Sequence, residues 1–198
     1  MYYITPQCPD HFRLLKKLYV SAFPRNERKP FSMIRRMFKK GKSDIWIFFD
    51  DGLFLGFAIT INSREIVLID YFAVNNDLRG KGYGSRMLNA LLAHYSPRGV
   101  FLEIEIPYEG EDTYTERIRR KRFYLNVGLT PMNTRVKLFG VDMELMGYNC
   151  FLDYQQYRKF YLDNYSKYVY KNIKQVEAKA LKWDKLMQKP ALFYGLIW

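Results

Sequence analysis

Apolar residues follow two different spacings along the chain, and the order of these spacings predicts a mixed α/β (α+β) fold. Short runs rich in β-branched and aromatic residues are typical of strands, whereas apolar residues three and four positions apart form one face of a helix. Strands are expected at residues 2–5, 45–49, 53–61, 65–74, 100–106, 132–139 and 142–148. Helices are expected after Asp10, which would cap the first, around residues 33–38, and over residues 85–95 and 113–127.

Three glycines stand where the strand ending at Val74 is expected to lead into a helix. Gly80, Gly82 and Gly84 precede a segment whose apolar residues at 87, 88, 91 and 92 lie on one helical face. Glycines allow backbone N–H groups to converge on a diphosphate, and the dipole of a helix N-terminus favours its negative charge. The segment therefore predicts an anion site for a phosphorylated cofactor.

The spacing of these glycines excludes two common nucleotide motifs. The dinucleotide fingerprint fails because Ser85 stands where its third glycine belongs, and no Gly-Lys-Ser/Thr closes a P-loop. The segment Arg79-x-x-Gly82-x-Gly84, preceded by a strand, resembles the coenzyme A loop of the GNAT family of N-acetyltransferases. The resemblance implies acetyl-coenzyme A as the cofactor. The implied cofactor-binding residues are Phe72, Ala73, Val74, Arg79, Gly80, Lys81, Gly82, Tyr83, Gly84, Ser85 and Asn89.

A second segment, Arg122-Phe-Tyr124-Leu-Asn-Val-Gly128, also resembles this family. There the resemblance implies that Tyr124 is the general acid that protonates the departing thiolate, which is a reasonable task for a phenol. The alternative is an ordinary aromatic on a helix face, in a chain with 17 tyrosines. Many members of the family carry an asparagine where this chain has Arg117, which indicates either a phosphate contact or divergence.

Two acids lie on one face of the expected strand 100–106. Because side chains alternate along a strand, Glu103 and Glu105 point the same way, and that face is expected to open on a polar cleft. Glu103 is the first candidate for the base that deprotonates an amine, and Glu105 for a contact to an ammonium group. Asp70 is a rival base, since the family often places an acid there. The alternative is that the acids pair with the arginines of residues 117–122.

The resemblance also implies the architecture. A GNAT acyltransferase fold has a mixed, mostly antiparallel central sheet with helices on both faces, and two parallel strands, here residues 65–74 and 100–106, splay apart. We expect residues 1–150 to form this domain. Residues 151–198 are expected to form a helical extension that packs on the domain or on a second subunit, because the apolar end at residues 191–198 favours burial.

Composition narrows the expected partners and location. The net charge of +12 fits nucleic-acid binding, but it equally fits a cleft that attracts the phosphates of coenzyme A, and no nucleic-acid-binding motif is present. No apolar run reaches the ~20 residues of a membrane-spanning helix. Cys8 and Cys150 lie far apart and form neither a disulfide framework nor a metal-ligand cluster, which is typical of a cytoplasmic protein.

The predicted function is therefore transfer of an acetyl group from acetyl-coenzyme A to a primary amine by direct attack in a ternary complex. The acids of the expected cleft favour a small cationic amine as the acceptor. Two alternatives stay open. A sensor that binds coenzyme A without turnover would explain the glycine loop, and a basic nucleic-acid-binding module would explain the charge.

Overall fold

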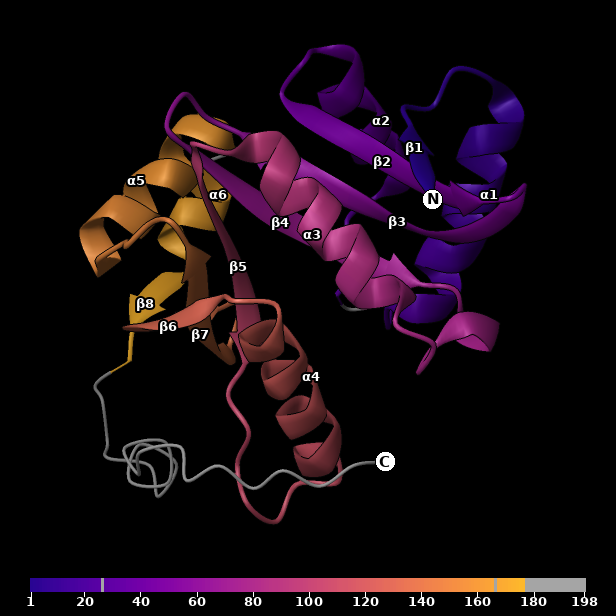
Figure 1. Ribbon diagram of the computed structural model, residues 1–198. Helices are drawn as coiled ribbons and strands as arrows, with labels where there is room; N and C mark the ends of the chain where they lie inside the picture. Colours follow the sequence, from indigo (N-terminus) through magenta and orange to yellow (C-terminus); the bar gives the residue numbers. More distant parts are fainter. Residues whose placement is uncertain (26, 166, 177–198) are drawn as a thin grey trace.

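An eight-stranded mixed sheet runs through the part of the chain that the computed structural model describes, residues 1–25, 27–165 and 167–176 (Figure 1). The strands lie in the order β1-β2-β3-β4-β5-β7-β6-β8. Their bounds are β1 Tyr2–Ile4, β2 Ser43–Asp50, β3 Leu53–Asn62, β4 Ile66–Val74, β5 Gly99–Glu105, β6 Thr130–Leu138, β7 Val141–Tyr148 and β8 Ile173–Gln175. All neighbours in this sheet pair antiparallel except β4 and β5, which are parallel.

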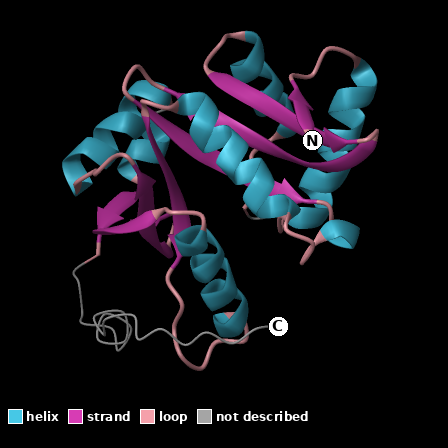
Figure 2. Ribbon diagram, viewed as in Figure 1, coloured by secondary structure: helices cyan, strands magenta, loops and turns pink. Residues whose placement is uncertain are grey.

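Helices cover both faces of this sheet (Figure 2). They are α1 Pro9–Ala22, α2 Phe31–Lys39, α3 Tyr83–Tyr95, α4 Tyr114–Asn126, α5 Tyr154–Asn164 and α6 Lys167–Lys171. Side chains of β2 point alternately to the two faces of the sheet. Trp46 and Phe48 belong to the core under α3 and α4. Ile45 and Ile47 belong to the core under α1 and α2. Helix α5 packs on the second face, over Phe101 and Leu145.

The pairing of β4 with β5 is short. Only Ile66, Val67 and Leu68 have partners on β5, and the two strands then diverge (Figure 1). On its other side, β4 follows β3 further, but the register shifts so that Asp70 has no partner between Ile69 and Tyr71. Such a bulge bends a strand and re-aims its side chains. The predicted mixed sheet with splayed parallel strands is confirmed.

The predicted order of elements up to residue 148 is also confirmed, with one error at a helix start. Helix α1 begins at Pro9 with Cys8 as its N-cap, so Asp10 does not cap it. Proline suits this first position because its missing N–H would have no partner there, and Asp10 instead pairs with Arg13 in the first turn at 2.7 Å.

Residues 151–176 add elements that the sequence pattern indicates only in part. A capping box of Asp153 and Gln156 begins α5, as expected for a helical extension. Strand β8 was not predicted. Its three residues are too few to show an alternating apolar pattern, and its pairing partner, β6, lies far from it in the sequence. The division of the chain at residue 150 and the proposed dimer stay predictions, and the apolar end at residues 191–198 lies outside the described residues.

Helix α4 is fixed to the sheet by a buried ion pair. The Nζ atom of Lys121 lies 2.6 Å from Oε2 of Glu144 on β7, and both side chains are almost fully enclosed. A buried charge that loses its partner is strongly destabilising, whereas replacing both members with apolar residues is often neutral. This pair therefore determines where α4 and its side chains stand relative to β5.

We expect Lys121→Met to lower the free energy of unfolding by about 3 kcal/mol, because the buried carboxylate of Glu144 loses the cation that bonds to it at 2.6 Å. The double variant Lys121→Met/Glu144→Leu should recover most of that loss. Urea denaturation of both variants measures the difference. Equal stability of the single variant and the wild type would contradict the assigned role of the pair.

Candidate active site

The glycine segment after β4 forms a turn that leads into α3. A short 3-10 helix, Asn76–Leu78, precedes it, and Gly82 is the N-cap residue of α3. Gly80 and Gly82 both have φ of +77°, a conformation that side chains strain, yet no atom lies within 4 Å of a Cβ placed on either. These two glycines are therefore required by the backbone path, and the space beside them is open.

Gly84 serves a different purpose. A Cβ at this position would come within 3.3 Å of Phe123 on α4 and of Val74 at the end of β4. The missing side chain thus lets the first turn of α3 approach both elements closely. The glycine segment, the end of β4 and α4 consequently form one packed unit.

The backbone N–H groups of six consecutive residues, 80 to 85, donate no hydrogen bond within the described part of the chain. The next N–H, that of Arg86, bonds to the carbonyl of Gly82 at 3.2 Å and begins the helical ladder. The side chains of Arg79 and Lys81 are exposed beside these donors. Successive free N–H groups at a helix N-terminus form an anion-binding concavity.

The other predicted cofactor contacts border this concavity. Ser85 is half-buried in the first turn of α3, and Asn89 is exposed one turn further on the same side. Phe72 and Val74 pack toward α3 and α4, and the Phe72 ring stacks on Phe123 with centroids 6.2 Å apart. Ala73 faces the opposite layer. Beyond Leu68 the edge of β4 that faces β5 has no strand partner.

Tyr124 is buried on α4, where it contacts Phe123 with ring centroids 5.1 Å apart. Its hydroxyl group makes no hydrogen bond within the described residues. Burial raises the pKa of the phenol above its usual 10.0, although the positive charge of Arg120 lowers it. Tyr124 therefore holds its proton at neutral pH, and that proton is free to be donated.

On the other face of the sheet, Glu103 is half-buried under α5. One of its carboxylate oxygens accepts hydrogen bonds from the hydroxyls of Tyr157 at 2.8 Å and Tyr161 at 2.6 Å. Burial raises the pKa of Glu103 above 4.5, although both hydroxyls lower it. The expectation that this face opens on a polar cleft is therefore wrong at Glu103, because tyrosines of α5 cover the carboxylate.

Glu105 already holds a cation. Its Oε2 accepts from Nε of Arg117 at 2.8 Å, and Arg117 also pairs with Glu111 and donates to the carbonyl of Ile106 at 3.2 Å. Arg117 therefore ties the start of α4 to the end of β5, and its guanidinium is engaged by these three acceptors. The alternative in which acids pair with the arginines of residues 117–122 is realised by Glu105, whereas Glu103 has no such partner among its hydrogen bonds.

Asp70, the extra residue of the β4 bulge, is paired with Lys29 from the connection between α1 and α2. The Lys29 Nζ lies 2.5 and 2.7 Å from the two carboxylate oxygens and donates to the Tyr165 hydroxyl at 3.0 Å. Neither Lys29 nor the tyrosines of α5 and its C-cap Tyr165 were among the predicted site residues. Their only signal is the crowding of tyrosines at residues 154–170, and the charged connection around Lys29 is typical of a surface loop.

The sequence profile of the Acetyltransferase (GNAT) family matches residues 12–127. This chain belongs to that family. The match ends just after α4, so it includes the glycine segment, Tyr124 and both diverging strands, and it leaves out β6, β7 and α5. A search of curated proteins gives no match.

Solved structures share the GNAT fold over most of the chain. A protein of Bacteroides thetaiotaomicron assigned to the GNAT family has 26% identity and a TM-score of 0.69, with 82% of this chain and 95% of that chain covered. A chimera of the Vibrio cholerae spermidine N-acetyltransferase SpeG and hSSAT has 14% identity and a TM-score of 0.58, covering 74% and 95%. An aminoglycoside 6'-N-acetyltransferase, solved with coenzyme A, has 14% identity and a TM-score of 0.59, covering 75% and 96%.

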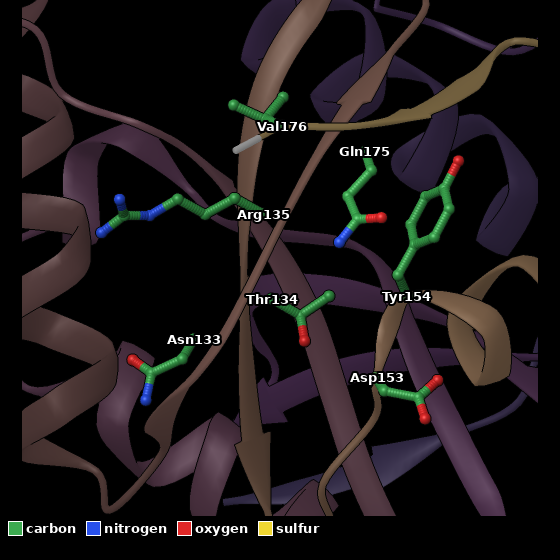
Figure 3. A pocket seen from close by; sticks show the side chains of 7 residues that line it. All are labelled: Asn133, Thr134, Arg135, Asp153, Tyr154, Gln175 and Val176. Carbon is green, nitrogen blue, oxygen red and sulfur yellow. The ribbon is translucent and has the colours of Figure 1, made fainter. Parts of the chain in front are cut away.

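One hollow in the described part of this GNAT chain lies away from these residues. It has a volume of about 390 Å³ and is lined by Asn133, Thr134, Arg135, Asp153, Tyr154, Gln175 and Val176 (Figure 3). These residues come from β6, β8 and the start of α5, and none of them is a predicted site residue. We therefore place the candidate site by its backbone donors and its titratable groups. None of the helices in the described residues has the length and apolar character needed to cross a bilayer.

Glu103 gives this site a pH-dependent stability. Because its pKa is raised in the folded protein, the folded state binds the proton more tightly than the unfolded chain, and the free energy of unfolding falls as pH rises above 4.5 through the raised pKa. Glu103→Gln removes this titration. We expect the stability of the variant relative to wild type to increase over that interval and then level off.

Urea denaturation between pH 4 and pH 8 measures this difference, with Glu65→Gln, a substitution of an exposed carboxylate, as the control. A stability difference between Glu103→Gln and wild type that stays constant with pH would contradict the assigned burial of Glu103.

Proposed function

We propose that this GNAT member transfers the acetyl group of acetyl-coenzyme A to a primary amine, by direct attack of the amine within a ternary complex. The observation that carries the proposal is the run of six free N–H groups at residues 80 to 85, beside the unpaired edge of β4. Backbone donors in this arrangement suit a diphosphate next to an extended arm. A nucleic-acid-binding module would leave both features without a purpose.

The residues present fit the coenzyme. The open space at Gly80 and Gly82 lets a diphosphate approach the backbone donors, and Arg79 and Lys81 supply positive charge beside them. Ser85 and Asn89 are placed to bond phosphate oxygens from the first two turns of α3. The edge of β4 at residues 72–74 has backbone groups left for the extended arm.

When bound, acetyl-coenzyme A supplies a thioester whose carbonyl an amine can attack. A backbone N–H near Ala73 would polarise this carbonyl, as donors of an oxyanion hole do. Tyr124 would give its proton to the departing thiolate, since its hydroxyl is protonated and makes no other bond in the described residues. The ammonium form of the acceptor must first lose a proton, for which Glu103 and Asp70 are the candidate bases.

A small cationic amine is the acceptor that these surroundings favour. Asp70 and Glu103 place negative charge on the face of β4 and β5 opposite α3 and α4, and several tyrosines surround them. Two proteins of similar fold are named for spermidine and for aminoglycosides, which are also polycationic amines.

We expect Gly82→Trp to weaken the binding of acetyl-coenzyme A at least tenfold, or about 1.4 kcal/mol, because the side chain fills the space in front of the free donors. Gly52→Trp is the matched control, since Gly52 has φ of +79° and open space but lies in the β2–β3 hairpin. Calorimetric titration at two salt concentrations measures both. Equal losses in the two variants would refute the proposed cradle.

We expect Tyr124→Phe to lower kcat about 100-fold while the KM for acetyl-coenzyme A changes less than about threefold, because only proton donation is lost. Tyr148→Phe, in the same apolar cluster, is the control. Steady-state kinetics with the best acceptor of an amine panel provides the measurement. An unchanged kcat would remove Tyr124 from the mechanism, and coenzyme binding without turnover of any amine would favour the sensor.

A further inference from the structure

The ammonium group of Lys29 lies in a cage of acid and aromatic side chains. Both oxygens of Asp70 bond to it, at 2.5 and 2.7 Å, and the Tyr165 hydroxyl accepts a further hydrogen bond at 3.0 Å. The same nitrogen lies 4.4 Å from the centroid of the Tyr165 ring and 5.4 Å from that of Tyr71. Such surroundings satisfy an ammonium group by charge, hydrogen bonding and cation–π attraction together.

This cage stands beside the proposed acetyl-transfer site. Asp70 is the bulge residue of β4, directly before the edge at residues 72–74, and it lies where β4 and β5 have already separated. Tyr165 stacks on Tyr161 with centroids 4.9 Å apart, and Tyr161 bonds to Glu103 on β5. The cage therefore connects both candidate bases.

The backbone of Lys29 is held separately from its side chain. Its N–H donates to the Tyr71 hydroxyl at 3.0 Å, its carbonyl accepts from the Tyr19 hydroxyl at 3.0 Å, and Tyr71 in turn donates to the carbonyl of Glu27 at 2.9 Å. The Asp70 side chain is 9% exposed, whereas that of Lys29 is 25% exposed. The Lys29 side chain is thus more exposed than its carboxylate partner, and hydrogen bonds of the backbone, not of the side chain, hold residue 29 beside the cage.

We propose that Lys29 occupies the subsite for the ammonium group of the acceptor, and that the acceptor displaces it to bind. This inference rests on the proposed function and specifies its substrate class. The cage receives a primary ammonium on an unbranched alkyl chain, because that is the group that Lys29 presents. Both a free polyamine and a lysine side chain of another protein carry this group.

Competition from the Lys29 side chain lowers the apparent affinity of the protein for the acceptor. A tethered competitor acts at an effective concentration in the millimolar range, and the apparent affinity of the acceptor falls by the fraction of molecules in which the cage is free. Truncating Lys29 removes the competitor and leaves Asp70, Tyr71 and Tyr165 in place. An ion pair with only a structural role predicts the opposite, since its loss would destabilise the protein without improving the binding of any amine.

The first test uses folding stability, so it needs no catalytic turnover. We expect n-butylammonium chloride to raise the Tm of Lys29→Ala by about 3 °C at saturation, relative to equal sodium chloride, because the ligand binds only the folded cage. Wild type and Arg28→Ala, a neighbouring variant with the same net charge as Lys29→Ala, keep the tethered competitor and should show a clearly smaller rise at the same concentration. Asp70→Asn added to Lys29→Ala should abolish the response. A Tm of Lys29→Ala that rises no more than that of wild type would overturn the proposal.

The second test uses kinetics with two acceptors, spermidine and a peptide with one central lysine. We expect Lys29→Ala to lower the KM of at least one of them about tenfold while the Kd of acetyl-coenzyme A is unchanged, and the acceptor with the larger gain identifies the source. If Lys29→Ala does not fold, Lys29→Gln, which keeps most of the stem, should still lower KM about threefold. A KM at or above that of wild type for both acceptors would overturn the proposal.

These outcomes separate the inference from the function on which it rests. If wild type binds acetyl-coenzyme A and the amine response is missing, the Lys29 subsite is wrong and the proposed transferase stands. If acetyl-coenzyme A does not bind, the proposed transferase function is refuted. The response of Lys29→Ala to n-butylammonium then still tests whether the cage binds an ammonium group.

Discussion

The early end of the parallel pairing between β4 and β5 is the constraint on which the other site features depend. After Leu68 the β4 edge loses its neighbour, and the bulge at Asp70 bends the strand at nearly the same place. A strand in mid-sheet normally satisfies its backbone groups on both sides. Here one side is left open inside the fold, with the free amides of α3 at its end, Tyr124 on one face, and Asp70 and Glu103 on the other.

Electrostatic pairs hold the elements on either side of this opening in position. Arg117 bonds to Glu105 and Lys121 to Glu144, so α4 is attached to β5 and β7 by two ion pairs along the helix that carries Tyr124. The charge of residues 117–122 is therefore partly used inside the protein. Arg117 is the clearest case, because its three acceptors leave no reason to assign it to a phosphate.

The parts of this structure that could be predicted from sequence are those with local signals. The strands have period-two or continuous apolar runs, and the loop at Gly80, Gly82 and Gly84 depends on backbone conformations that glycine alone favours. The partners of the acids are separated from them by 41 residues for Asp70 and Lys29, and by 54 and 58 residues for Glu103 and its two tyrosines. No periodic pattern in the sequence indicates pairs that are this far apart. The acids could therefore be predicted as candidates, whereas the side chains that contact them could not.

This difference also indicates where the chain acquires its own specificity. The proposed coenzyme side consists of backbone N–H groups, which depend on the path of the chain and little on its side chains. The proposed acceptor side consists of side chains, and Tyr157, Tyr161 and Tyr165 all lie beyond residue 127, where the family match ends. A fold that fixes one substrate through its backbone leaves the other face free to change. In this chain that face is covered by α5 and by Lys29, which lies near the N-terminal end of the sequence.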